Sequence, residues 1–181
     1  GRFHVAGEKW YGSNGNNRAK GLPRSILMVM LNDVETGKPL AYMSGNLLSS
    51  MRTGAMPGLA AKLLAVKDAK VLSLLGCGVV SKACLMSIMT VRPDIEVIKL
   101  KGSSPTSKTA LNMKKYIEEN YPDVKEVTIC STMEEAVRDA DIVSEAISCM
   151  QGQWPEVKRE WMKKGLLYIS SSTFNMDYKS I

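Results

Sequence analysis

The sequence lacks the features that mark several large classes of protein. No apolar run reaches the roughly 18 residues of a membrane-spanning helix, and the run at residues 26–31 has only the length of a strand. There are no internal repeats or low-complexity tracts. Hydrophobic residues make up 45% of the chain and charged residues 23%, as in an ordinary globular domain, so we expect no membrane partner.

Signatures of metal sites and disulfides are missing too. His4 is the only histidine, and the four cysteines form no C-x-x-C pair, so we predict no metal site. Scattered cysteines in apolar company, in a chain of 181 residues, indicate a reduced, cytoplasmic protein.

The positive charge is modest and dispersed. The net charge of +6 comes from lysines and arginines that are not massed with aromatic residues, so nucleic-acid binding is not predicted. An anionic small-molecule ligand would account for part of this charge equally well.

Residues 70–89 are the most informative stretch. They pass from a short apolar run through Gly76 and Gly78 into apolar residues at helical spacing, which is the order strand, tight turn, helix. A dinucleotide-binding βαβ unit needs this order, because its glycines turn the chain and admit a pyrophosphate while the helix N-terminus, here near Val79, faces the phosphates. Ser81 occupies the third position, where glycine or alanine is usual. The alternative is a strand-to-helix turn without a ligand.

The segments before this turn predict a small α+β portion. Glycine and asparagine indicate loops in residues 1–24. Residues 25–32 and 39–44 predict a hairpin whose first strand has no polar face, so we expect that strand to be buried on both sides. Apolar spacing predicts helix over residues 46–66. Pro57 interrupts this pattern, so we expect two helices or a kink, with the break near residues 51–55.

Strands and helices alternate in the rest of the chain. We predict strands over residues 95–101, 126–129, 141–147 and 166–170, and helices over residues 105–120 and 133–138. This alternation is typical of an α/β fold with a doubly wound, Rossmann-like parallel sheet. We place the boundary between the α+β portion (residues 1–66) and the Rossmann-like domain (residues 67–181) near residues 67–70.

Five segments together resemble one known family. They are Lys9-Trp-Tyr-Gly-Ser-Asn14, Gly37-Lys-Pro-Leu40, Met51-Arg-Thr-Gly-Ala55, Leu75-Gly-Cys-Gly78 and Ala140-Asp-Ile-Val143. In this order they resemble the ornithine cyclodeaminase and mu-crystallin family over essentially the whole chain. The resemblance implies a nicotinamide cofactor and a homodimer whose subunits combine a Rossmann domain with a substrate and dimerisation domain. Since members continue on both sides of these segments, we expect an internal fragment with a partial first domain and a C-terminally incomplete second one.

The resemblance also implies roles for individual residues. Lys9 and Arg52 would hold a substrate carboxylate, a task suited to fixed cations, and Thr53 would contact the cofactor. The remaining cofactor-binding candidates on this pattern are Gly76, Gly78, Val79, Val80, Ser148 and Ser170.

The region after the last predicted strand departs from the cyclodeaminase pattern. Hydroxyl residues occupy positions 170–173, where that pattern has its reactive aspartate, and Asp177 follows a few positions later as a catalytic candidate. We therefore do not expect strict ornithine cyclodeamination. We predict an NAD(P)-dependent enzyme, an oxidoreductase or cyclodeaminase-like lyase, with hydride transfer at the α-carbon of a small amino acid or cyclic imine.

Two alternatives stay open. One is a mu-crystallin-like NADP(H)-binding protein without substantial turnover. The other is a biosynthetic enzyme that oxidises a glutamate adduct on the way to a metal-binding metabolite.

The end of the second Rossmann strand favours NADP(H) over NAD(H). An NAD site usually has an acidic residue there, but Glu96 stands at the beginning of this predicted strand. Lysines and hydroxyls, which suit a 2′-phosphate, dominate the strand end instead. The candidates are Lys101, Gly102, Ser103, Ser104 and Lys108. A solvated loop is the alternative.

Overall fold

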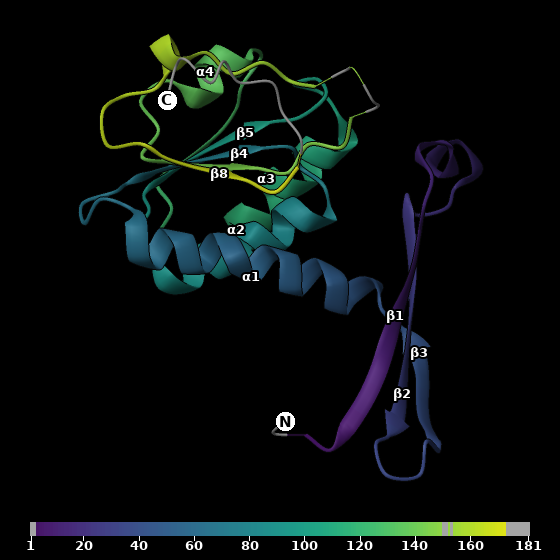
Figure 1. Ribbon diagram of the computed structural model, residues 1–181. Coiled ribbons are helices and arrows are strands. Elements are labelled where there is room, and N and C mark those ends of the chain that lie inside the picture. The colour runs from purple at the N-terminus through teal and green to yellow at the C-terminus, as the bar shows by residue number, and fades with distance from the viewer. Residues whose placement is uncertain (1–2, 150–151, 153, 173–181) are drawn as a thin grey trace. The chain divides into compact units, whose positions relative to one another are not determined.

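A computed structural model describes residues 3–149, 152 and 154–172. The chain divides into two compact units, Gly1–Met51 and Arg52–Ile181, and most of their elements are labelled in Figure 1. This division falls within the first helix, whereas the sequence places the domain boundary after that helix. The assignment of a substrate domain and a cofactor domain stays a prediction. None of the helices in the described ranges is long and apolar enough to cross a bilayer.

An antiparallel sheet makes up most of the first unit. Its strands β1 (Val5–Ser13), β2 (Ser25–Asp33) and β3 (Pro39–Ser44) lie in the order β1-β2-β3, and a 3-10 helix, η1 (Gly15–Lys20), joins the first two. The hairpin of β2 and β3 is confirmed. The expectation of loops throughout residues 1–24 is wrong, because β1 pairs with β2 over its whole length. Every residue of β1 is exposed, so no apolar alternation reveals the strand.

Strand β2 is buried on one face only, which corrects the expectation of burial on both. Leu27 and Val29 are 4% and 8% exposed, whereas Ile26 is 46% exposed, as expected when alternate side chains point to opposite faces of a sheet. Asn46, the first residue of the helix that follows β3, is hydrogen-bonded to β2. Its side chain accepts a hydrogen bond from the Leu27 N–H at 2.8 Å and donates one to the Ser25 carbonyl at 2.9 Å.

Helix α1 (Asn46–Leu64) continues through Pro57, so the two-helix alternative is wrong. Proline has no N–H and leaves the Thr53 carbonyl without its helical donor. Close packing against helix α2 (Val79–Val91) offsets this loss. A Cβ on Gly54 would lie 2.5 Å from the carbonyl carbon of Ala83, and the Ser87 hydroxyl donates a hydrogen bond to the Gly54 carbonyl.

A five-stranded parallel sheet forms the centre of the second unit (Figure 1). Its strands are β4 (Val71–Leu75), β5 (Val97–Lys101), β6 (Glu126–Ile129), β7 (Ile142–Glu145) and β8 (Leu167–Ser170). Helices α2, α3 (Lys108–Asn120) and α4 (Met133–Val137) follow the first three strands, and η2 (Arg159–Trp161) precedes β8. The strands lie in the order β6-β5-β4-β7-β8. The chain forms the central strand β4 first, adds β5 and β6 on one side of it, and then adds β7 and β8 on the other side. This is a Rossmann-like order, and the predicted fold class is confirmed.

Two apolar cores cover the two faces of this sheet. Leu72 and Leu74 of β4 belong to one core, which includes residues of α2 and α3. Leu75 and Val143 belong to the other, which includes residues of α4. Figure 1 accordingly shows α2 and α3 on one side of the sheet and α4 on the opposite side. Helices on both faces were predicted from the alternation of strands and helices.

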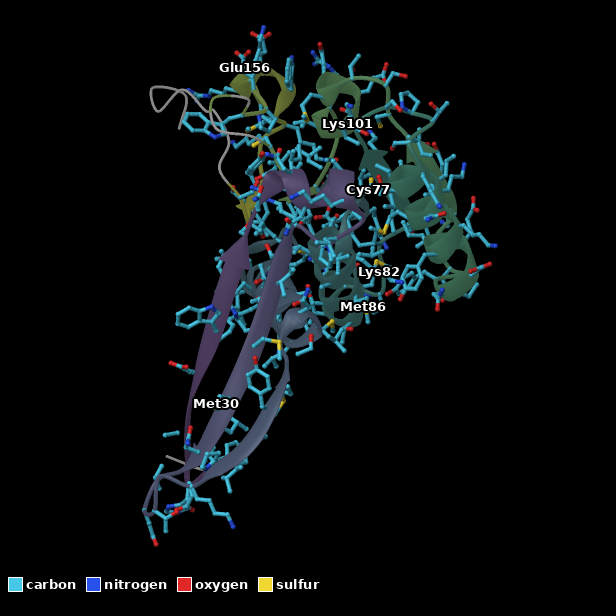
Figure 2. The ribbon with its side chains drawn as sticks, turned by 90° about the vertical axis from the view of Figure 1, so that its right-hand side faces the viewer. Met30, Cys77, Lys82, Met86, Lys101 and Glu156 are labelled. Atoms are coloured by element: carbon cyan, nitrogen blue, oxygen red, sulfur yellow. The ribbon has the colours of Figure 1, made fainter. Side chains whose placement is uncertain are left out.

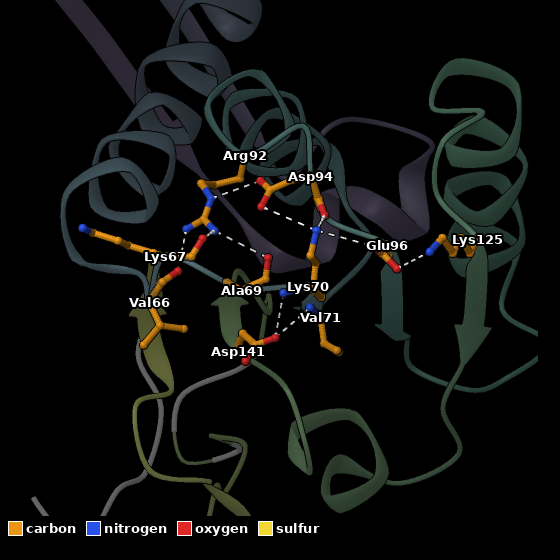
Figure 3. Close-up of polar contacts among 10 residues, drawn as sticks. All are labelled: Val66, Lys67, Ala69, Lys70, Val71, Arg92, Asp94, Glu96, Lys125 and Asp141. Carbon is orange, nitrogen blue, oxygen red and sulfur yellow. Dashed lines mark hydrogen bonds and ion pairs between the residues drawn. The ribbon is translucent and has the colours of Figure 1, made fainter.

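Asp141 lies where the parallel strands begin, which we call the amino edge (Figure 3). Its carboxylate accepts hydrogen bonds from the backbone N–H groups of Lys70 at 2.8 Å and Val71 at 2.9 Å, and Lys163 Nζ lies 2.6 Å from its other oxygen. Burial acts to raise the pKa of Asp141, but the Lys163 hydrogen bond and the two N–H groups outweigh burial and lower it. Asp141 therefore fastens the start of β4 to the start of β7.

Further charges are paired at the amino edge. Arg92 is 9% exposed and donates hydrogen bonds to the carbonyls of Val66 and Lys67, both at 2.9 Å. Glu96 forms ion pairs with Lys70 and Lys125, and the hydrogen bonds from these lysines, Lys125 first, lower its pKa (Figure 3). These contacts hold the entry of β4 and β5.

Candidate functional site

The opposite edge, where the parallel strands end, is called here the carboxyl edge, and Gly76 begins the turn after β4 there. Its φ of +99° favours glycine, and a Cβ would lie 2.7 Å from the carbonyl oxygen of Ala146 in the turn after β7. The Gly76 N–H donates to the carbonyl of Lys101, the last residue of β5, at 2.8 Å. Both neighbours of β4 therefore constrain this glycine.

Gly78, by contrast, borders open space. A Cβ placed on it would meet no atom within 4 Å, so the backbone is accessible to a ligand at the N-cap of α2. The first turn of this helix has no acidic residue and no side-chain cap. Its N–H groups, including those of Val79 and Val80, are thus available to an anion such as a phosphate.

Ser81 is a buried residue that forms a hydrogen bond within the turn. It is 1% exposed, and its hydroxyl donates a hydrogen bond to the Gly76 carbonyl at 2.6 Å. Ser81, which stands where glycine or alanine is usual, therefore adds a hydrogen bond that stabilises the turn.

Cys77 and Lys101 lie at the same edge (Figure 2). Burial raises the pKa of the Cys77 thiol to about 11, although Lys101 acts in the opposite direction. The thiol is neutral at pH 7, which makes it a packing residue rather than a nucleophile. Lys101 Nζ donates a hydrogen bond to the Gly102 carbonyl at 2.7 Å, so this cation stays at the end of β5.

The turn from β5 into α3 needs its glycine. A Cβ on Gly102 would lie 2.6 Å from Ser107 Oγ and 2.9 Å from Ala110 Cβ. The other candidates of this turn are half-buried or exposed, and they are Ser103, Ser104 and Lys108. Glu96, the acidic residue weighed above as a ribose ligand of an NAD site, forms ion pairs with lysines at the amino edge. It therefore lies at the opposite end of β5 from the carboxyl edge.

Glu145, the last residue of β7, is 0% exposed, and no role is predicted for it from the sequence. Its carboxylate accepts hydrogen bonds from the Ile147 N–H at 2.7 Å, from the Ser170 hydroxyl at 3.0 Å and from the Ser172 hydroxyl. The available signal was an acidic residue in the middle of an apolar strand pattern. Ser170, predicted to bind the cofactor, directs its hydroxyl to this carboxylate.

The remaining candidates are placed as follows. Lys9 is exposed on β1 of the first unit, with its Nζ 5.9 Å from the centre of the Tyr11 ring. Arg52 is exposed and Thr53 half-buried on α1, and Ser148 is exposed after β7. Asp177 lies outside the described residues. The structure brings together the candidates that follow β4, β5, β7 and β8, because parallel strands end at one edge.

Strand order, glycine turn and open helix N-terminus define a Rossmann-like nucleotide-binding class of fold. Comparison with known proteins places the chain within that class. The profile of the ornithine cyclodeaminase/mu-crystallin family matches residues 1–176, so the chain belongs to this family.

Two curated relatives illustrate the range within the family. The N-((2S)-2-amino-2-carboxyethyl)-L-glutamate dehydrogenase of Staphylococcus aureus is 31% identical over 166 residues, 91% of this chain and 48% of the relative. The alanine dehydrogenase of Archaeoglobus fulgidus is 32% identical over 160 residues, 88% of this chain and 46% of the relative. The chain thus spans about half the length of these relatives.

Solved structures agree with this membership. The Thermococcus litoralis Delta(1)-pyrroline-2-carboxylate reductase in complex with NADH and L-proline superimposes with a TM-score of 0.81 at 32% identity, over 91% of this chain and 48% of that one. An archaeal alanine dehydrogenase dimer with bound NAD gives a TM-score of 0.78 at 33% identity, over 91% of this chain and 48% of that one.

Proposed function

We propose that the protein containing this chain is an NAD(P)-dependent oxidoreductase that transfers hydride to or from the α-carbon of a small amino acid or cyclic imine. The observation that carries this proposal is the Gly76 to Ser81 turn, which lies where the strand order changes direction and leaves Gly78 open. In sheets of this kind, dinucleotides bind in the crevice at that point.

The names of the relatives support this class of substrate. They include an alanine dehydrogenase, Delta(1)-pyrroline-2-carboxylate reductases and an amino-carboxyethyl-glutamate dehydrogenase. Each of these names contains an amino acid, an adduct of one or a cyclic imino acid. We assign Lys9 and Arg52 to the substrate carboxylate and Thr53 to the cofactor, and we expect a homodimer. The buried free thiols of Cys77, Cys84 and Cys130 support a cytoplasmic location.

The cofactor we propose is NADP(H) in preference to NAD(H). Lys101, Ser103, Ser104 and Lys108 lie at or just after the end of β5, and Glu96 is held at the amino edge. Titration of the full-length protein with NADPH and NADH, followed by nicotinamide fluorescence, tests the preference. Tighter binding of NADPH is expected, and Lys108→Ala should reduce it selectively. Equal or tighter binding of NADH would contradict this preference and leave the oxidoreductase proposal intact.

A substrate panel tests the reaction itself. The full-length protein is supplied with oxidised or reduced cofactor and with L-alanine, L-proline, pyrroline-2-carboxylate, ornithine and an N-(amino-carboxyethyl)-glutamate. We expect reversible absorbance changes of the reduced nicotinamide with at least one amino acid or imine. Ammonia release from ornithine without net cofactor turnover would identify a cyclodeaminase. Cofactor binding with no turnover on any compound would favour a mu-crystallin-like binding protein.

A further inference from the structure

Glu145 is a fully buried acidic side chain at the carboxyl edge. None of the ion pairs found among residues 3–149, 152 and 154–172 includes it. Burying a carboxyl group without a counter-charge is unfavourable unless hydrogen bonds replace its lost hydration. The hydrogen bonds of Glu145 therefore show which groups replace its lost hydration.

Those contacts join the ends of two neighbouring strands. One carboxylate oxygen accepts the N–H of Ile147, just after β7, and the hydroxyl of Ser172, just after β8. The Ser170 hydroxyl is shared between the second carboxylate oxygen at 3.0 Å and the Ser172 carbonyl at 2.7 Å. The Ser171 N–H also donates to the Glu145 carbonyl at 2.8 Å. The Glu145 side chain thus connects the segment that follows β7 to the segment that follows β8.

The exit of β7 is the surface against which the glycine turn is packed. The Ala146 carbonyl oxygen, next to Glu145 in the chain, is the atom that a Cβ on Gly76 would meet at 2.7 Å. The segment after β7 therefore contacts the glycine turn through Ala146 and is tied to the end of β8 through Glu145.

A dinucleotide crosses such a sheet at the change of direction, with one mononucleotide on each half. The turns after β4 and β5 belong to the half that has the glycines and lysines. The turns after β7 and β8 belong to the other half. We propose that Glu145 is a positioning residue for the nicotinamide half of the site, which it shapes by locking these two turns together. This proposal rests on the proposed cofactor-dependent function.

The two halves can be probed separately in the full-length protein. The dissociation constant of NADPH reports on both halves, whereas that of 2′,5′-ADP reports on the adenosine half alone. Glu145→Ala leaves the Ile147 N–H and Ser172 hydroxyl without their acceptor, so NADPH binding should weaken about tenfold or more while 2′,5′-ADP binding changes less than about twofold. Glu145→Gln keeps an acceptor oxygen and gains an N–H donor for Ser170, so it should restore NADPH affinity to within about threefold of wild type.

Controls separate positioning from a loss of folding. Glu126→Ala removes an exposed acid at the amino edge and should change neither constant. If Glu145→Ala fails to fold, Ser172→Ala removes one donor and should weaken NADPH binding about threefold with 2′,5′-ADP binding retained. Equal weakening of both ligands, unchanged binding of both, or no recovery with Glu145→Gln would overturn the proposal. A wild-type protein that binds neither NADPH nor NADH would instead refute the proposed function on which it depends.

Discussion

The two edges of the parallel sheet are built from different chemistry. At the amino edge, Asp141, Arg92 and Glu96 are each engaged by opposite charges or backbone groups. At the carboxyl edge, glycines control the backbone, Gly78 borders open space, and Glu145 is satisfied by hydroxyl and N–H groups. The same strands thus start in a paired electrostatic network and end in a pre-shaped, ligand-accessible surface.

This difference separates stability from binding along each strand. A substitution at the amino edge removes contacts between elements of the fold. A substitution at the carboxyl edge can alter the backbone that a ligand would touch. The comparison can therefore be tested by asking whether the free energy of unfolding and the cofactor affinity respond to different substitutions.

The largest effect is expected for Gly76→Ala. The new Cβ would require an unfavourable φ of +99° and would meet the Ala146 carbonyl at 2.7 Å, so we expect a loss of about 3 kcal/mol in the free energy of unfolding. Gly78→Ala is the matched control. Its Cβ meets no atom within 4 Å, so stability should be retained while cofactor affinity falls. Chemical denaturation and cofactor titration measure the two effects, and a stable Gly76→Ala variant would contradict this account of the turn.

Asp141→Ala should destabilise the fold by about 2 kcal/mol, because the N–H groups of Lys70 and Val71 would lose their acceptor. The dissociation constant of the cofactor should stay unchanged, since the substitution lies at the amino edge. Asp94→Ala provides the comparison, because its carboxylate is 41% exposed and should matter much less. A cofactor affinity that fell with Asp141→Ala would break the separation of the two edges.

The Asp141 contribution should depend on pH. The lowered pKa of this group in the folded protein means that its stabilisation is complete above the usual value of 3.8 and disappears as the pH falls through the folded value. Denaturation of wild type and Asp141→Ala at pH 7 and at successively lower pH should show the difference shrinking only below about pH 4. A difference that stayed constant into strong acid would show that the charge of Asp141 is not involved.

The smallest effect is expected for Ser81→Ala. Alanine suits the close packing at this position, so only the hydrogen bond to the Gly76 carbonyl is lost, at about 1 kcal/mol of unfolding free energy. Thermal unfolding should detect this change. Ser81→Val, which adds volume at a residue only 1% exposed, should be clearly worse.

Local patterns were sufficient to predict the parts of the fold that local patterns control. The glycines of the turn and the alternation of strands and helices led to the Rossmann-like sheet, and residues 126–129 and 39–44 match β6 and β3. Strand β1 was not predicted, because every one of its residues is exposed and the strand depends on its pairing with β2. Pro57 led us to expect two helices or a kink with the break near residues 51–55, but α1 is one continuous helix that packs on α2 at Gly54.

The contacts within the candidate site depend on residues far apart in the sequence. Glu145 and Ser170 are separated by 25 positions and Asp141 and Lys70 by 71, so neither pair forms a motif. Only the order of strands in the sheet makes them neighbours. The sequence could therefore name Gly76, Gly78 and Lys101 as candidates, but it could not reveal that a buried carboxylate ties β7 to β8.

The hydrogen bond from Ser81 to the Gly76 carbonyl has a kinetic consequence. A turn that is already closed has no segment to order when a dinucleotide arrives, so association should not be preceded or followed by a slow rearrangement of this turn. In stopped-flow mixing, the observed rate should then rise in proportion to cofactor concentration, in a single phase without a plateau. Loosening the turn with Ser81→Gly should introduce a second, concentration-independent phase.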